Sequence, residues 1–212
     1  MRKDKISSAV IRRLPRYYRH LDDLHRSGSI RISSGALAKT MGLTASQIRQ
    51  DLSCFGEFGQ QGYGYNVERL RSEVADILGM NRDHTVVILG AGNLGRALIE
   101  NFSFDTNGFK LIAAFDVDPA LVGGFVGGVP VYHVDTLESY VKEHKVSVGV
   151  LTVPALVAKS SAQMLAACGV EGIWNFTNVE LPEHEMQSVK FENVHFADSL
   201  LTLSYMISEE QI

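Results

Sequence analysis

The chain lacks the features that mark several classes of protein. It has two cysteines and one tryptophan among 212 residues, and no apolar run approaches the roughly 18 residues of a membrane span. Cys54 and Cys168 supply neither a disulfide framework nor a zinc cluster, so a reducing, cytoplasmic location is expected. No signal peptide is predicted. With 45% hydrophobic and 21% charged residues, the composition is that of a globular protein and excludes secreted, membrane, collagen-like and disordered classes.

Charge is distributed unevenly along the chain. Residues 1–80 hold 13 lysines and arginines against 8 acidic residues, a net charge of +5, whereas residues 81–212 hold 7 against 16, a net charge of −9. Two ordinarily solvated surfaces would give the same counts, but the asymmetry favours a polyanion as partner of the first part only. Asn81-Arg82-Asp83, between Gly79 and a β-branched run, is the expected domain boundary.

The first eighty residues follow helical spacing. Pro15 is expected in the first turn of one helix, and Ser33 or Ser34 is expected to cap a short second helix that Gly42 closes. Thr44-Ala45-Ser46-Gln47 has the pattern of a capping box at the start of a third helix. A short helix, a glycine turn and a capped helix in this order predict a helix-turn-helix.

The third helix has a polar face suited to DNA. Ile48, Leu52 and Phe55 form its buried stripe, and the side chains left outside can bond base edges and phosphates. From this helix alone, a solvated face on a small bundle remains the alternative. The contacts expected here are Thr44, Ser46, Gln47, Arg49, Gln50 and Ser53.

The neighbours of this helix favour DNA binding. The glycine-punctuated aromatic segment Phe58–Tyr65 predicts a hairpin like the wing of a winged helix, and Asn66 is expected to cap a connecting helix. Arginines near the first helix are placed to reach phosphates or a minor groove. We therefore predict a winged helix DNA-binding domain over residues 1–80. Its further expected contacts are Arg12, Arg13, Arg16, Tyr17, Gln60, Gln61 and Tyr63.

A nucleotide-binding fingerprint opens the second part. Thr85–Leu89 reads as a buried strand, Gly90–Gly95 follows directly, and a helix comes next, which is the context that a GxGxxG motif requires. The first glycine allows the turn, the second lets backbone approach a pyrophosphate, and the third lets helix pack on strand. The phosphates then lie at the positive helix end. The contacts expected here are Gly90, Ala91, Gly92, Asn93, Leu94 and Gly95.

An acidic residue ends the next predicted strand. Asp116 lies 21 residues beyond Gly95, where a carboxylate accepts both ribose hydroxyls of an adenosine. It would repel a 2′-phosphate, and Val117-Asp118-Pro119 supplies no arginine to neutralise one. We therefore predict NADH and NAD+ as the bound dinucleotides, with Asp116 and Val117 in their site.

Strands and helices continue to alternate through residues 81–196, which predicts a Rossmann-like, doubly wound parallel sheet. The expected fold class is therefore α/β, with a winged helix-turn-helix domain before this NAD(H)-binding domain. Ligands bind beyond the carboxyl ends of such strands. The expected wall of the pocket is Thr152, Val153, Pro154, Asn175 and Phe176.

The second part shows no predicted catalytic group. A dehydrogenase needs a proton donor or acceptor beside the nicotinamide and usually a substrate domain, and too few residues remain to build one. No Tyr-x-x-x-Lys pair is present, and no Cys/His spacing suggests a metal. We predict a binding protein that is not an enzyme. An NAD-dependent enzyme with a DNA-binding module, or a domain for CoA or another nucleotide, is the alternative.

The carboxyl-terminal segment, residues 197–212, is apolar on more than one side if helical. Such a helix is usually buried, either on its own sheet or by insertion between domains or into a second subunit. Because a DNA-reading helix normally works as one of a symmetric pair, we expect this segment to be a dimerisation helix.

Taken together, these segments resemble the Rex family of bacterial redox-sensing transcriptional repressors, over nearly the whole chain. The resemblance implies a homodimer with exchanged carboxyl-terminal helices. It also implies repression of fermentative and respiratory genes from palindromic operators, which are released when NADH rises relative to NAD+. The matching segments are Gln47–Ser53, Phe55–Gly59, Gly62–Tyr65, Leu14–Tyr17, Gly90–Gly95, Ala114–Asp118, Leu151–Pro154 and Asn175-Phe176.

Three positions depart from the family pattern. Members often carry lysine at Gln50, tyrosine at Asn101 and aspartate at His195, although Asp198 lies nearby. In the family, that aspartate helps couple the bound cofactor to the first-helix arginine, here Arg16. We expect the coupling either to involve His195 and Asn101 or to give an altered response to NADH.

Overall fold

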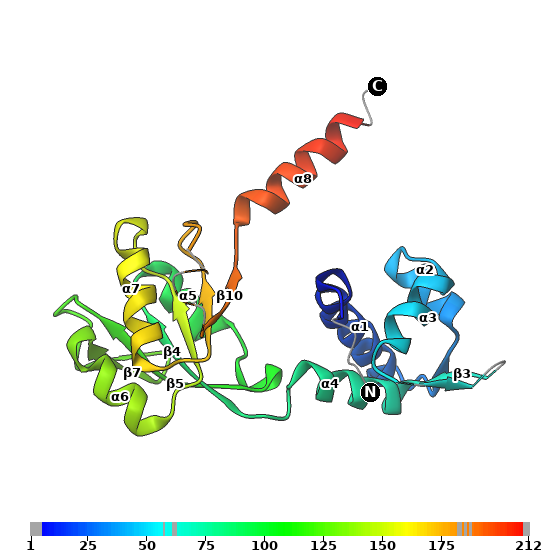
Figure 1. Cartoon of the computed structure of the whole chain (residues 1–212), viewed down its shortest axis with the longest axis horizontal. Coiled ribbons are helices and arrows are strands. Elements are labelled where there is room, and N and C mark those ends of the chain that lie inside the picture. The colour runs from blue at the N-terminus through cyan, green and yellow to red at the C-terminus, as the bar shows by residue number, and fades with distance from the viewer. Residues whose placement is uncertain are drawn as a thin grey trace. The chain divides into compact units, whose positions relative to one another are not determined.

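The structure is a computed structural model that describes residues 6–56, 58–60, 63–181, 184, 186 and 188–209. The chain divides into two compact units, residues 1–82 and 83–212 (Figure 1). The first unit has one hydrophobic core, and the second has a core on each face of its sheet. Within the described residues, no helix is both long enough and apolar enough to cross a bilayer.

The amino-terminal unit combines four helices with a small three-stranded sheet. Strand β3 lies between β1 and β2 and is antiparallel to both, so β2 and β3 form the predicted wing hairpin. Helices α2 and α3 form the helix-turn-helix. The elements are α1 (Ser8–Arg26), β1 (Arg31–Ile32), α2 (Ser34–Met41), α3 (Ala45–Ser53), β2 (Gly59–Gln60), β3 (Gly64–Asn66) and α4 (Val67–Leu78).

The predicted N-cap residues of this unit are confirmed, although the capping box predicted for Thr44–Gln47 forms only through Thr44. The hydroxyl of Ser33 accepts a hydrogen bond from the Ala36 N–H at 3.0 Å, and Thr44 caps α3 in the same way. Asn66 caps α4 through its amide oxygen. Gly42 ends α2 in the left-handed conformation, at φ +66°. These short-range bonds satisfy the N–H and C=O groups that helix ends leave free.

The first helix begins earlier than predicted. Pro15, which we expected in the first turn, lies in the middle of α1, whose N-cap is Ser7. Proline removes one backbone N–H, and the carbonyl that loses its partner is that of Ile11, on the exposed side of the helix. Burial of the opposite side stabilises the earlier turns. The buried residues of α1 are Val10, Leu14, Tyr17 and Leu21.

The carboxyl-terminal unit is the predicted doubly wound sheet. Its seven strands lie in the order β10-β9-β8-β4-β5-β7-β6 and are parallel except for the β6–β7 pair. The two edge strands, β6 and β10, were not predicted. The elements are β4 (His84–Leu89), α5 (Asn93–Asn101), β5 (Phe109–Asp116), β6 (Phe125–Val126), β7 (Val129–His133), α6 (Leu137–His144), β8 (Val148–Leu151), α7 (Ala155–Cys168), β9 (Gly172–Asn175), β10 (Lys190–Asn193) and α8 (Phe196–Glu209).

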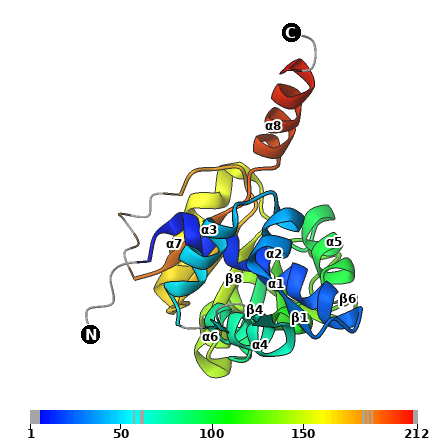
Figure 2. The same cartoon turned by 90° about the vertical axis from the view of Figure 1, so that its right-hand side faces the viewer.

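Side chains of the central strand alternate between two cores. Val87 of β4 belongs to the core that includes Leu165 of α7, and its neighbour Ile88 belongs to the core that includes Ile99 of α5. Figure 2 shows α5 and α7 on opposite sides of the sheet. Because helices cover both faces, the carboxyl ends of the strands are where a ligand site of this fold lies.

Candidate nucleotide site and DNA-contacting surface

The three fingerprint glycines meet different steric demands. Gly90 has φ +96°, and a Cβ there would lie 2.8 Å from the carbonyl oxygen of Thr152. A Cβ at Gly95 would overlap the carbonyl oxygen of Gly90. At Gly92, a Cβ would meet no atom within 4 Å. Packing therefore requires the first and third glycines, and the second leaves the turn bare on its outer side, as the approach of a pyrophosphate requires.

The amino-terminal end of α5 completes a cradle for phosphates. Gly92 is its N-cap and carries no side chain to bond the first-turn N–H groups, so these groups and the helix dipole suit an anion. Ala91 is fully buried, Asn93 is exposed and Leu94 is half-buried. The residues present fit the diphosphate of a dinucleotide.

The carboxylate of Asp116 ties the fingerprint turn to the end of β5. Its Oδ2 accepts a hydrogen bond from the Ala91 N–H at 2.6 Å, and its Oδ1 accepts from the N–H groups of Val117 and Asp118 at 2.7 and 3.0 Å. A carboxylate has about four lone-pair sites, so one remains for a ribose hydroxyl. A second ribose hydroxyl must share a site that already accepts a backbone N–H. The side chain of Val117 is exposed.

The loop after β8 contacts the fingerprint turn. Strand β4 lies between β5 and β8, so the strand order reverses here and gives the switch point at which ligands bind in such sheets. The hydroxyl of Thr152 lies 2.7 Å from the carbonyl oxygen of Gly90. Val153 is half-buried, and Pro154 is exposed as the N-cap of α7. The sheet thus brings Thr152 to the predicted site.

The structure corrects the expected role of Asn175. Its amide nitrogen donates to the Val179 carbonyl and to Asn193 Oδ1, both at 2.8 Å, and its amide oxygen accepts two hydrogen bonds from Thr177. Because Asn175 is buried and its polar atoms are engaged within the protein, its side chain positions the loop after β9 instead of contacting a ligand.

Aromatic rings lie beyond the end of β9. Phe176 is buried and packs edge-to-face against Trp174, with ring centroids 4.6 Å apart, and Phe196 lies 6.1 Å away. Next to it, His195 has a buried Nε2 that lies 3.3 Å from Glu180 Oε1 without hydrogen-bond geometry. Among the described residues, no group of three or more His, Cys, Asp or Glu could hold a metal ion.

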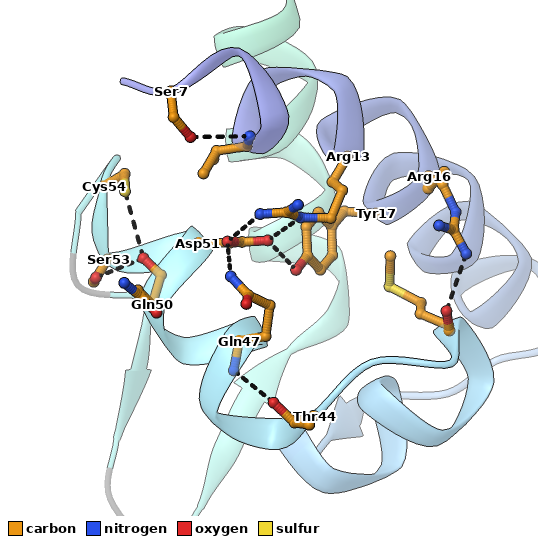
Figure 3. A network of polar contacts seen from close by, with 12 residues as sticks. Ser7, Arg13, Arg16, Tyr17, Thr44, Gln47, Gln50, Asp51, Ser53 and Cys54 are labelled. Carbon is orange, nitrogen blue, oxygen red and sulfur yellow. Dashed lines mark hydrogen bonds and ion pairs between the residues drawn. The ribbon is translucent and has the colours of Figure 1, made fainter. Parts of the chain in front are cut away.

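In the amino-terminal unit, polar groups converge on the fully buried carboxylate of Asp51 (Figure 3). Arg13 donates from Nε and Nη2 at 2.6 and 2.8 Å, the Tyr17 hydroxyl at 2.8 Å, and Gln47 Nε2 at 2.7 Å. Burial acts to raise the pKa of Asp51, but these hydrogen bonds and the charge of Arg13 outweigh it and hold the pKa below its usual value. Asp51 was not predicted as a site residue, although its helical spacing places it on the buried face of α3.

This network changes the expected roles of two residues. Tyr17 is 0% exposed, so the prediction that it contacts DNA is corrected: it belongs to the core, where burial and then its bond to Asp51 raise the pKa of its hydroxyl. Arg13 gives two of its donor groups to Asp51, and its side chain is 23% exposed. Arg13 therefore links α1 to α3, and its guanidinium has further donors that these two bonds do not use.

The other expected contacts of α1 to α3 lie at the surface. Arg16 donates to the Met41 carbonyl at the end of α2, and Arg49 donates to the Ser34 hydroxyl at 3.1 Å. Both bonds leave further guanidinium donors available. The exposed residues are Arg12, Arg16, Thr44, Ser46, Arg49, Gln50 and Ser53, and Gln47 is half-buried.

The wing is held by a residue that we did not predict. The Arg31 guanidinium lies 5.9 Å from the centroid of the Tyr63 ring, and its Nη1 donates to the Tyr63 carbonyl. Tyr63 itself is 70% exposed. Gln60 belongs to β2, but its side chain is outside the described part of the chain, as is the whole of Gln61.

Comparisons with known proteins find relatives that match both units of the chain. Residues 5–53 match the family model "Putative DNA-binding protein N-terminus", and residues 81–179 match the model "CoA binding domain". The redox-sensing transcriptional repressor Rex of Clostridium tetani is 47% identical over 210 residues, which is 99% of each chain. Rex of Clostridium beijerinckii is 47% identical over the full length of both chains.

Solved structures give the same result. A crystal structure of RSP in complex with β-NAD+ and operator DNA has a TM-score of 0.90 and 46% identity, and covers 98% of this chain and 94% of that chain. RSP in complex with β-NADH has a TM-score of 0.89 and 43% identity, and covers 97% of this chain and 96% of that chain. RSP is described as a Rex-family repressor. The chain therefore belongs to the Rex family of redox-sensing transcriptional repressors.

Proposed function

We propose that this chain is a cytoplasmic, homodimeric transcriptional repressor that binds a palindromic operator and releases it when NADH replaces NAD+. The observation that carries the proposal is its full-length similarity to a Rex-family repressor solved with both NAD+ and operator DNA. Its relatives are named as repressors and not as enzymes. The dinucleotide is thus a signal, and the chain needs no catalytic residues.

DNA binding is assigned to the amino-terminal unit. The polar face of α3 enters the major groove, as recognition helices do, and the wing and the arginines of α1 reach the backbone. The proposed contacts are Arg12, Arg13, Arg16, Thr44, Ser46, Gln47, Arg49, Gln50, Ser53, Gln60, Gln61 and Tyr63, with Arg31 added by the structure.

Nucleotide binding is assigned to the carboxyl-terminal unit. The turn Gly90–Gly95 holds the diphosphate, Asp116 and Val117 the adenosine ribose, and the loop Thr152–Pro154 the adjoining wall. The nicotinamide ring is charged in NAD+ and neutral in NADH, so an apolar region near Phe176 imposes a desolvation penalty on the oxidised form alone. About 1.4 kcal/mol of such a penalty gives a tenfold preference for NADH.

Helix α8 supports the proposal of a dimer, within a dimerisation segment of residues 197–212. A helix that is apolar on several sides is stable when it is covered. We assign a second copy of the chain as the cover, because a palindromic operator presents two half-sites to two recognition helices. In the single chain seven apolar residues of α8 are 51–67% exposed: Phe196, Leu200, Leu201, Leu203, Tyr205, Met206 and Ile207.

A gel-shift experiment tests the proposal. An operator is first selected from random duplexes with the protein free of nucleotide, and the complex is then exposed to NADH, NAD+ or NADPH at equal concentrations. We expect release by NADH and no effect of NADPH, because Asp116 repels a 2′-phosphate. A complex that ignores NADH would remove the sensing role and leave the repressor.

CoA is the second candidate ligand, because residues 81–179 match the family model that bears its name. Calorimetry separates the two candidates. NADH binding that is undiminished by excess CoA is the expected result, and displacement of NADH by CoA would reassign the site.

A further inference from the structure

Gln47 occupies a reading position of the proposed recognition helix. It is the third residue of α3, and amino-terminal residues of such helices contact base edges. In a capping box its side chain would return to the Thr44 N–H. Instead, Gln47 Nε2 donates to Asp51 at 2.7 Å, and within the described residues no hydrogen bond joins the Gln47 side chain to the Thr44 backbone. The capping box is therefore half formed, through the Thr44 hydroxyl alone.

The bond to Asp51 determines which way the Gln47 amide faces. The two ends of an amide have nearly the same shape, so only hydrogen bonding distinguishes its oxygen from its nitrogen. Asp51 is ionised because its pKa is lowered, and an ionised carboxylate only accepts. Arg13 and Tyr17 fill its remaining positions with donors. The nitrogen end of Gln47 must therefore face Asp51.

We infer that Asp51 orients the Gln47 amide so that α3 reads one adenine in each half-site of the operator. The inference rests on the proposed function, in which α3 is the recognition helix. One Nε2 hydrogen is bonded to Asp51, which leaves the Oε1 acceptor and the second N–H donor of the same amide for a base. Asp51 is a positioning residue in this arrangement, and Gln47 determines specificity.

Of the four bases, only adenine matches both the acceptor and the donor of this amide. In the major groove adenine offers the N6 amine as a donor and N7 as an acceptor, which is the complement of an acceptor–donor pair. Guanine presents two acceptors, cytosine a donor, and thymine an acceptor beside a methyl group. A freely rotating glutamine loses more conformational entropy on binding than one that is already held.

The packing of α1 on α3 maintains this orientation. Arg13 and Tyr17 belong to α1, and their bonds to Asp51 span 38 and 34 residues of sequence. Asp51 is 0% exposed, so water does not compete for its oxygens. A change in the bonds of Asp51 thus alters how Gln47 presents its amide without touching the other DNA-facing side chains of α3.

The test is selection of operators from a randomised duplex library by the full-length protein free of nucleotide. The wild type is expected to select a palindrome with one adenine per half-site preferred about 10- to 100-fold. Gln47→Ala should lose the preference at that position alone. Replacement of that adenine by 7-deazaadenine, which lacks the N7 acceptor, should weaken binding by the wild type and not by Gln47→Ala.

The role of Asp51 is tested with a matched pair of variants. Asp51→Asn should flatten the same position of the selected motif, because an asparagine there can face Gln47 with either end. Asp22→Asn is the control: Asp22 of α1 accepts from Arg71 of α4 at 2.7 Å and from Arg26 of α1 at 2.8 Å, and among the described residues it has no bond to α3. It removes the same charge from the same unit and should leave the motif unchanged.

Gln47→Glu is a second test of how residue 47 is oriented, for use if Asp51→Asn does not fold. A carboxylate at this position cannot donate to the ionised Asp51 and is repelled by it, so the orientation and the preference for adenine should both be lost. A motif that is the same in the wild type and Gln47→Ala would overturn the inference, as would Asp51→Asn that binds more weakly with an unchanged motif. Failure of the wild type to select any motif would instead overturn the proposed function.

Discussion

The two proposed sites of this chain consist of different chemical groups. The nucleotide turn consists of backbone N–H groups and glycines, and its shape depends on the space left where Cβ atoms are missing. The proposed DNA-contacting surface consists of long side chains, two of which, Arg13 and Gln47, converge on one buried carboxylate together with the core residue Tyr17. The first site is therefore sensitive to added atoms, and the second to a removed charge.

An aspartate links distant segments in both sites. Asp116 accepts from one backbone N–H of the nucleotide turn and from two of its own loop, whereas the donors found for Asp51 among the described residues are side chains. Backbone donors are present whatever the sequence, so the link through Asp116 needs one specific residue. The link through Asp51 needs four, which makes it easier to break by substitution.

The largest effect is expected from adding a methyl group to the turn. The Cβ of Gly95→Ala overlaps the backbone at Gly90, so we expect the carboxyl-terminal unit to lose about 3 kcal/mol or more of unfolding free energy. Gly92→Ala is the control: it should keep stability within about 1 kcal/mol and still lose NADH affinity. Urea unfolding followed by the fluorescence of the single tryptophan, Trp174, measures the stability of both variants, and titration with NADH measures their affinity. Equal stability of the two variants would contradict the account.

Removal of the Asp51 carboxylate should have the next largest effect. Asp51→Ala leaves Arg13 without its partner, and loss of one member of a buried pair costs about 3–5 kcal/mol. Because Arg13 is partly exposed, we expect about 3 kcal/mol, measured by circular dichroism during urea unfolding. NADH titration, which reports on the other unit, should be unchanged. A loss below about 1 kcal/mol would show that the network does not hold α1 to α3.

Substitution of the other aspartate should affect affinity more than stability. Asp116→Ala removes the carboxylate that accepts from the ribose and from Ala91, so NADH affinity should fall about 10- to 100-fold. Operator binding without nucleotide should persist. Asp118→Ala is the control in the same loop, because Asp118 Oδ1 accepts from the Ala120 N–H and, within the described part of the chain, not from the nucleotide turn. If calorimetry gave the two variants equal NADH affinities, the assignment of the ribose would be wrong.

Acid should affect the amino-terminal unit through Asp51. The folded pKa of Asp51 lies below its unfolded value of about 3.9, so the carboxylate stabilises the fold above that pH and loses this contribution as pH falls through the folded pKa. We expect the unfolding free energy to vary little near neutrality and to decrease below about pH 4. The decrease should be shallower in Asp51→Asn. Parallel curves for the two proteins would contradict this.

The smallest effect is expected at an arginine without an internal partner. Within the described part of the chain, Arg12 is exposed and makes no ion pair or hydrogen bond. Arg12→Ala should weaken binding to all DNA sequences alike and reduce the salt dependence of binding by about one released ion per subunit. Arg13→Ala should in addition lower stability, because Arg13 is bound to Asp51. The two variants are compared by fluorescence anisotropy at several salt concentrations.

Short-range patterns predicted much of this molecule. The caps at Ser33, Thr44 and Asn66 depend on bonds between residues three apart, and the fingerprint at Gly90–Gly95 depends on a turn between adjacent elements. Alternating strands and helices were sufficient to predict the sheet. These features follow from local sequence, so they were predictable without knowledge of the packing.

Features that depend on packing between distant segments were not predicted correctly. The Asp51 network joins residues 34 and 38 apart, and it turned Tyr17 from an expected DNA contact into a core residue. Asn175 likewise has a structural role, because its amide donates a hydrogen bond to Asn193 on the unpredicted edge strand β10. The roles of the residues that remain at the surface depend on ligands and stay predictions.

The central claim is that the ratio of NADH to NAD+ controls occupancy of the operator. It is tested most directly by fluorescence anisotropy of a labelled operator with the full-length protein, at constant total dinucleotide and varied ratio. Bound operator is expected to decrease as the NADH fraction rises, and Asp116→Ala is expected to shift this curve to higher NADH. Anisotropy that stays constant from pure NAD+ to pure NADH, with NADH shown to bind, would contradict it.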